Sequence, residues 1–113
     1  MKLPDAERAV VEDAKVRDYL LSPEHPVGRF KARAFTAAGY HVLQWQRFRD
    51  DLRILARSVD VTLARTDAFG HHFVGVGVLV TPSGRPLPIV TVWLIPSTGA
   101  APRLITAYPH EAA

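Results

Sequence analysis

Four polar side chains of this sequence are candidates for chemistry on a phosphodiester: His25, Lys31, Thr106 and Tyr108. An imidazole such as that of His25, just before Pro26, can serve as a general acid or base. The Lys31 ammonium can hold a phosphate or stabilise a developing negative charge. Thr106 and Tyr108 are two residues apart in a predicted strand, so their hydroxyls share a face and can position a phosphate. Each of the four residues, taken alone, also has a purely structural interpretation.

Lys31 stands out because helical periodicity places it among apolar residues. At about 100° per residue, a helix starting near Pro26 has an apolar stripe made of Val27, Ala34 and Ala38, with Phe30 and Phe35 on its flanks. Lys31 falls inside this stripe. A buried ammonium is costly unless it is paired or its stem lets it reach water. We therefore expect Lys31 to end in a cleft, where it serves the chemistry, or in a closed structural contact.

The elements that must position these side chains change character at Ser58. Before it, apolar periodicity predicts helices over about 12–21, 26–38 and 44–57, with Gly39 ending the second. After it, period-two alternation predicts strands over 59–65, 71–80, 87–95 and 103–108. The expected fold is α+β, with about three N-terminal helices packed on one face of a three- to four-stranded antiparallel sheet. We expect a single domain over 1–113, with a helical half at 12–57 and a sheet at 58–109.

The strand alternation also predicts which sheet face meets the helices. The expected core face is aliphatic: Val74, Val76, Val78, Val90, Val92, Leu94, Ile105 and Ala107. The opposite face is mixed: Phe73, Gly75, Gly77, Thr91, Trp93, Leu104, Thr106 and Tyr108. Two glycines on one face expose backbone to something that approaches closely. That neighbour is a ligand, or equally a loop or a second subunit. If it is a ligand, we expect the mixed face to bind substrate through Gly75, Gly77, Thr91 and Trp93, with Arg29 and Arg103 from its surroundings.

Composition limits the classes of function. The chain has 113 residues, a formal net charge of +3 and no cysteine, which excludes disulfides and thiolate chemistry. Residues 25–57 carry seven Lys/Arg against two acids, as a polyanionic partner requires, although such charges also simply solvate helices. His71 and His72 are adjacent in a strand and point to opposite faces, so we expect no metal site and no cofactor. Without a signal peptide or membrane-spanning run, we expect a cytoplasmic protein that binds no membrane.

The segments LPDAERAV, KVRDYLLSPEHPVGRFKARAFTAAGY, PSGRPLPIVTVWLI and PRLITAYP resemble a bacterial domain family of unknown function. The resemblance runs from about Leu3 to Pro109 and includes the spacing HPxGxxKAxxF. Members of that family occur alone and at the C-termini of large polymorphic toxins, so relatives are delivered as part of a larger secreted toxin. The order of helices and strands is also similar to the barnase–EndoU–colicin–RelE group of RNases. That likeness implies metal-free attack by the ribose 2′-hydroxyl, with roles for His25, Lys31, Thr106 and Tyr108.

Two functions follow from these patterns. The leading hypothesis is a toxin-like, metal-independent endoribonuclease that cleaves RNA by general acid–base catalysis and is controlled by an immunity- or antitoxin-like partner. The alternative is a non-catalytic protein-interaction module, either a homodimer or the partner of a small protein from a neighbouring gene. In that alternative the mixed face is a protein interface and Lys31 is structural.

Overall fold

The computed structural model describes residues 1–110 and has an α+β architecture. Its helical elements are η1 (Ala6–Arg8), α1 (Asp13–Lys15), η2 (Val16–Leu20), α2 (Gly28–Ala37), η3 (Val42–Gln44) and α3 (Trp45–Ser58). Its strands are β1 (Asp60–Asp67), β2 (Gly70–Val80), β3 (Pro86–Pro96) and β4 (Arg103–Pro109). The strands form one antiparallel sheet in the order β1-β2-β3-β4. The predicted fold class is confirmed.

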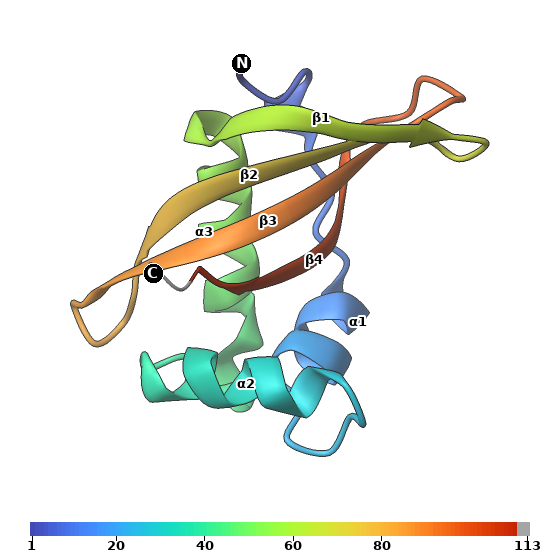
Figure 1. Ribbon diagram of the computed structural model, residues 1–113. Coiled ribbons are helices and arrows are strands. Elements are labelled where there is room, and N and C mark those ends of the chain that lie inside the picture. Colours follow the sequence, from blue (N-terminus) through green and yellow to red (C-terminus); the bar gives the residue numbers. More distant parts are fainter. Residues whose placement is uncertain (111–113) are drawn as a thin grey trace.

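The helices lie on one side of the sheet and beyond its β4 edge (Figure 1). α3 crosses behind the sheet, whereas α1 and α2 lie next to one another below β4. Phe48 of α3 is fully buried, and its ring lies 4.6 Å from that of Phe35 and 4.4 Å from that of Tyr40. These aromatic contacts join α2 and α3 within the core. Among residues 1–110, no helix combines the length and apolar character needed to cross a bilayer.

α2 is bounded by identifiable signals at both ends. Gly39 has φ +104°, and the backbone N–H of Tyr40 donates to the Phe35 carbonyl at 3.1 Å. This is a Schellman-type end, in which glycine accepts the left-handed conformation without strain, as the sequence predicts. The helix buries a narrow side made of Gly28, Ala32 and Phe35. The buried side of α2 therefore differs from the predicted apolar stripe. α2 contacts the core only along one side and leaves Val27 and Phe30 exposed.

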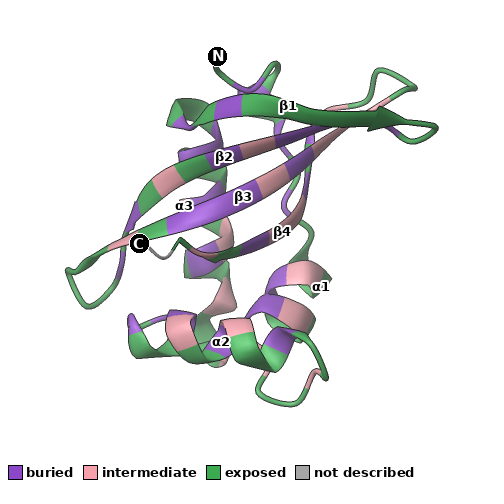
Figure 2. Ribbon diagram, in the orientation of Figure 1, coloured by how far each residue is buried: buried purple, intermediate pink, exposed green. Residues whose placement is uncertain are grey.

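The assignment of the two sheet faces was wrong for β2 and for Thr91 and Trp93 of β3, although Val90 and Ala107 are buried as predicted. Thr91 and Trp93 are fully buried against the helical layer, whereas Val76 and Val78 are 46% and 54% exposed. Figure 2 shows the middle of β3 buried and most of β1 exposed, whereas exposed and more buried residues alternate along the second half of β2. Strand alternation identifies the two faces of a sheet but does not say which face the helices cover. In this sheet the buried aromatic residues lie on the face that the helices cover.

Two glycines make room for close packing, Gly77 against α3 and Gly75 against β1. A Cβ atom placed on Gly77 would lie 2.6 Å from Cδ1 of Leu55 in α3. One on Gly75 would lie 2.6 Å from the Asp60 carbonyl oxygen of β1. The absent side chains therefore make room for the protein's own core, and no ligand is needed to explain them.

A β-bulge in β4 breaks the predicted alternation. Val92 pairs with Thr106 and Trp93 pairs with Leu104, so Ile105 is an extra residue. As a result Leu104 and Ala107, three residues apart, are both buried. The bulge immediately precedes Thr106, whose side chain meets α2.

The buried hydroxyl of Thr91 yields a test of this face assignment. It donates to the Gly75 carbonyl at 3.3 Å and accepts from the Trp93 indole N–H at 2.9 Å. Thr91→Val keeps the shape but leaves the indole N–H without an acceptor, so we expect the free energy of unfolding to fall by about 1–3 kcal/mol. Urea denaturation measures this. The matched control, Thr62→Val on exposed β1, should change it by less than about 0.5 kcal/mol; equal effects would contradict the assignment.

Candidate functional site

Lys31 joins three segments that are distant in the sequence. Its ammonium, projecting from α2, donates one hydrogen bond to the hydroxyl of Tyr19 in η2 and another, 3.1 Å long, to Oγ1 of Thr106 in β4. The side chain is half-buried. No carboxylate in residues 1–110 forms an ion pair with it. The ammonium is thus positioned by neutral groups and keeps an uncancelled positive charge.

Tyr19 is the member of this cluster that sequence reasoning missed. Burial of its phenol raises the pKa, but the hydrogen bonds with Lys31 and Thr106 and the charges of Lys31 and Lys15 outweigh burial, so the pKa of Tyr19 lies below the usual value of 10. The Lys15 ammonium lies 5.3 Å from the centre of the same ring. A phenol with a lowered pKa beside an ammonium is a candidate proton acceptor. Periodicity assigned Tyr19 to an apolar stripe, and the only sequence signal for another role was its hydroxyl.

His25 caps α2 next to Tyr19. Its Nδ1 accepts hydrogen bonds from the backbone N–H groups of Val27 at 3.1 Å and Gly28 at 3.0 Å. The tautomer inferred from these two bonds carries its proton on Nε2, so neutral His25 presents a donor to its surroundings. Its ring stands edge-on to Tyr19, with 4.8 Å between the ring centres. His25 therefore has a structural role, and one nitrogen remains for a ligand.

Gly28 lets α2 approach the helix that carries Tyr19. A Cβ atom at position 28 would lie 2.1 Å from the backbone oxygen of Tyr19, so no larger residue fits without displacing one helix. This close approach brings the first turn of α2, and with it Lys31, over the Tyr19 side chain. The glycine and the histidine cap together determine where the ammonium lies.

A surface cavity of ≈ 440 Å³ opens beside this cluster. Its lining consists of Glu12, Ala14, Lys15, Asp18, Tyr19 and His25. Both acids of the lining are neutralised by arginines: Glu12 pairs with Arg103 at 2.6 Å and Asp18 pairs with Arg17 at 3.0 Å. Lys15 and the neighbouring Lys31 have no such partner, so the cavity favours an anion.

The remaining predicted site residues make no hydrogen bond with the Lys31 ammonium. Arg103 belongs to the ion pair with Glu12, which occupies its guanidinium. Tyr108 is exposed, pairs with Val90 across the sheet and makes no hydrogen bond with Lys31. Arg29 is exposed on α2 beside Phe30. The predicted substrate contacts of Gly75, Gly77, Thr91 and Trp93 are not possible on an open face, because that face is the core.

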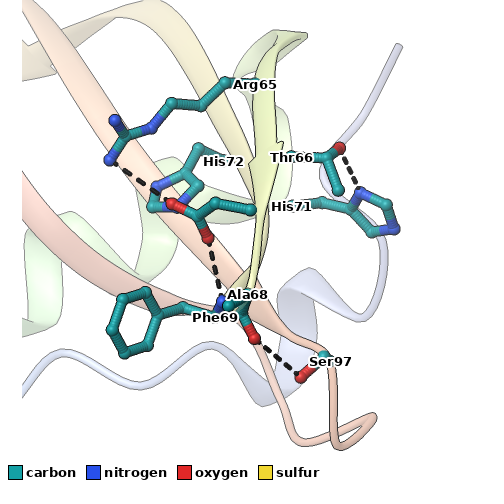
Figure 3. Close-up of polar contacts among 8 residues, drawn as sticks. Arg65, Thr66, Ala68, Phe69, His71, His72 and Ser97 are labelled. Carbon is teal, nitrogen blue, oxygen red and sulfur yellow. Dashed lines mark hydrogen bonds and ion pairs between the residues drawn. The ribbon is translucent and has the colours of Figure 1, made fainter.

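A second polar cluster closes the hairpin between β1 and β2. His72 contacts Asp67 at 2.9 Å, and His71 contacts Thr66 at 2.8 Å. Figure 3 shows the two imidazoles on opposite sides of the strand. Burial alone would raise the pKa of Asp67, but the hydrogen bonds from His72 and the Phe69 backbone hold it below its usual range. Residues 1–110 contain no group of three side chains able to hold a metal ion. The hydrogen bonds of this cluster stabilise the turn between β1 and β2.

The fold and the cluster define a small α+β protein whose cationic cavity lies at the edge of an antiparallel sheet. The chain belongs to a family described as a domain of unknown function (DUF6883), which matches residues 2–111. No curated protein matches it. The structure is similar to a chain from the contact-dependent growth inhibition toxin–immunity protein complex of Klebsiella pneumoniae 342, with a TM-score of 0.62 and 17% sequence identity. The alignment covers 97% of this chain and 100% of that chain, and at this identity it establishes the shared fold.

Titration of Tyr19 tests the geometry of the cluster. The difference in absorbance near 295 nm between wild type and Tyr19→Phe should show a phenol that ionises below pH 10. In the Lys31→Met background, the ionisation of Tyr19 measured in the same way should move to higher pH. Lys31→Met removes a hydrogen bond and a positive charge that both favour the phenolate. The sign for stability follows: just below pH 10 the folded state has lost a proton that the unfolded state retains, so stability rises with pH relative to Tyr19→Phe. A Tyr19 that titrates at or above pH 10 in wild type would contradict the described contacts.

Proposed function

We propose that this protein is a toxin-like endoribonuclease that cleaves RNA without a metal ion. The observation that carries the proposal is the Lys31 ammonium, which has no carboxylate partner and is hydrogen-bonded to Tyr19 and Thr106 beside an open cationic cavity. The fold that the chain shares with a member of a toxin–immunity complex supports a toxin-related role. Fold alone does not define chemistry, so the argument depends on the site.

In the proposed reaction the fraction of Tyr19 that is ionised, which grows as the pH approaches its lowered pKa, accepts the proton of a ribose 2′-hydroxyl. The 2′-oxygen attacks the adjacent phosphorus and the 5′-oxygen leaves, which gives a 2′,3′-cyclic phosphate and a 5′-hydroxyl. The 5′-oxygen takes a proton from water and Tyr19 returns the proton it accepted to water, so no other reactant is consumed. Lys31 stabilises the negative charge that develops on the phosphate, and Thr106 holds the ammonium in position. His25 donates from Nε2 to a phosphate oxygen, and Tyr108 takes no part.

Loss of the ammonium should therefore abolish most activity. We expect the purified protein to cleave single-stranded RNA in the presence of a chelator, and Lys31→Met to lower the cleavage rate about 100- to 1,000-fold without unfolding the protein. Gel analysis of end-labelled RNA measures the rate, and expression of the wild type should slow growth whereas expression of Lys31→Met should not. Lys2→Met, which removes an exposed lysine paired with Asp60, is the control and should leave the rate unchanged. A wild type that leaves RNA intact and growth normal would refute the proposal.

His25 needs a variant that separates its two roles. His25→Asn retains a side-chain acceptor that can cap α2, but removes the imidazole N–H. Under the proposed mechanism this variant unfolds at nearly the wild-type urea concentration and cleaves RNA more slowly. A variant as active as wild type would remove His25 from the reaction and leave it as a cap.

A second candidate function is a protein-interaction module, and one observation favours it. The outer face of β2 exposes Val76, Val78 and Val80, an aliphatic row of the kind that proteins bury in interfaces. Under this function the purified protein associates with itself as its concentration rises, Val78→Asp prevents the association, and RNA is neither bound nor cut. Analytical ultracentrifugation, together with the RNA assay above, separates the two functions.

A further inference from the structure

The outward side of α2 carries an exposed aromatic ring with two guanidinium groups close to it. Phe30 is 57% exposed, and the guanidinium carbons of Arg29 and Arg33 lie 4.8 Å and 5.8 Å from the centre of its ring. These distances are within cation–π range. The core does not account for Phe30, because the buried side of α2 is made of Gly28, Ala32 and Phe35.

Both arginines are available to a ligand. Within residues 1–110 neither Arg29 nor Arg33 pairs with a carboxylate, whereas Arg17, Arg49 and Arg103 all do. The two guanidinium groups also line a groove of ≈ 470 Å³ along α2. The rest of its lining is small or apolar: Pro23, Ala32, Thr36 and Ala37. A groove with unpaired cations and an adjacent exposed ring suits a ligand that is both anionic and planar.

We propose that Arg29, Phe30 and Arg33 form a binding face for unpaired RNA, on which a base stacks on Phe30 and the flanking phosphates contact the two arginines. This inference rests on the proposed function and extends it to the class of substrate. Phe30 directly precedes Lys31 on α2 and lies about 100° from it around the helix axis, so a bound RNA chain would pass around α2 to reach the Lys31 ammonium. Stacking on a side chain requires a base whose face is free, so the substrate is single-stranded at this point.

The pairing of ring and charge distinguishes RNA from an acidic protein. A polyanionic peptide needs the arginines but gains little from an aromatic face, whereas a nucleotide uses both. Removing the ring while keeping the charges therefore tests which ligand the face fits.

The test measures binding separately from cleavage. A fluorescent single-stranded oligonucleotide with 2′-O-methyl groups cannot be cleaved by 2′-hydroxyl attack, and its anisotropy reports binding. We expect Phe30→Ala to weaken binding about 5- to 100-fold and Phe30→Trp to preserve it. Arg29→Gln with Arg33→Gln should reduce the slope of log affinity against log salt by about 1.4, for two phosphate contacts on a single strand.

Two controls match these variants in composition. Phe69→Ala removes an exposed phenylalanine at the tip of the β1–β2 hairpin, and Arg53→Gln with Arg57→Gln removes two exposed charges from α3. Neither should approach the effect of its α2 counterpart. If wild type cuts and binds RNA but the α2 variants bind like their controls, the binding face is refuted while the ribonuclease stands. If wild type neither cuts nor binds RNA, both fail. If Phe30→Ala weakens binding of poly-glutamate as much as that of RNA, the face fits an acidic protein and the inference is overturned.

Discussion

The Lys31 ammonium is the contact on which the whole site depends, because its two hydrogen bonds join α2 to η2 and to β4. Partial burial of a lysine disfavours its charge, and most proteins offset this with a carboxylate. Here two hydroxyls take that place. A carboxylate would satisfy the ammonium and also cancel its charge toward a ligand. The Thr106 hydroxyl and the protonated Tyr19 phenol satisfy the ammonium and leave its charge in force. The closed ion pair that would have made this helix purely structural is therefore absent from residues 1–110.

Three features place the ammonium, two in the backbone and one in the side chain of His25. Gly28 permits the close approach of α2 to the backbone of Tyr19. The Nδ1 atom of His25 satisfies the first free N–H groups of α2 and so determines where that helix begins. The bulge at Ile105 offsets β4 by one residue just before Thr106. A one-residue shift in the start of α2 or in the register of β4 would move Lys31 or the Thr106 hydroxyl to another face.

Much of the fold could be predicted from the sequence because apolar periods of 3.6 and 2 are local properties. All three helices and four strands were predicted close to their observed positions, and Gly39 ends α2 as expected. Which face of the sheet the helices cover could not be predicted. Thr91 and Trp93 carry polar groups, but within the core the Trp93 indole N–H donates a hydrogen bond to the Thr91 hydroxyl, so both can be buried. Valines that suggested a core instead lie exposed on β2. Burial depends on which side the helices cover, and that is a tertiary property.

Part of the candidate site could be predicted from local sequence patterns, and part depends on contacts between distant segments. Lys31 and Thr106 were identified from their positions on a helix and a strand, and the structure brings them together. Tyr19 was not, since a tyrosine at a core spacing gives no local sign that its hydroxyl meets an ammonium. Arg103 was expected near substrate but pairs with Glu12, a contact across segments that no local pattern reveals.

The central claim is that this cluster cuts RNA through the ribose 2′-hydroxyl, and the chemical ends of the product test it most directly. The measurement is mass spectrometry of an oligoribonucleotide treated with the protein in the presence of a chelator, beside the same oligonucleotide carrying one 2′-deoxy residue at the cut position. We expect a 2′,3′-cyclic phosphate and a 5′-hydroxyl from the first, and no cut at the substituted position of the second. A 3′-hydroxyl with a 5′-phosphate, or cleavage that continues past the 2′-deoxy substitution, would contradict the account.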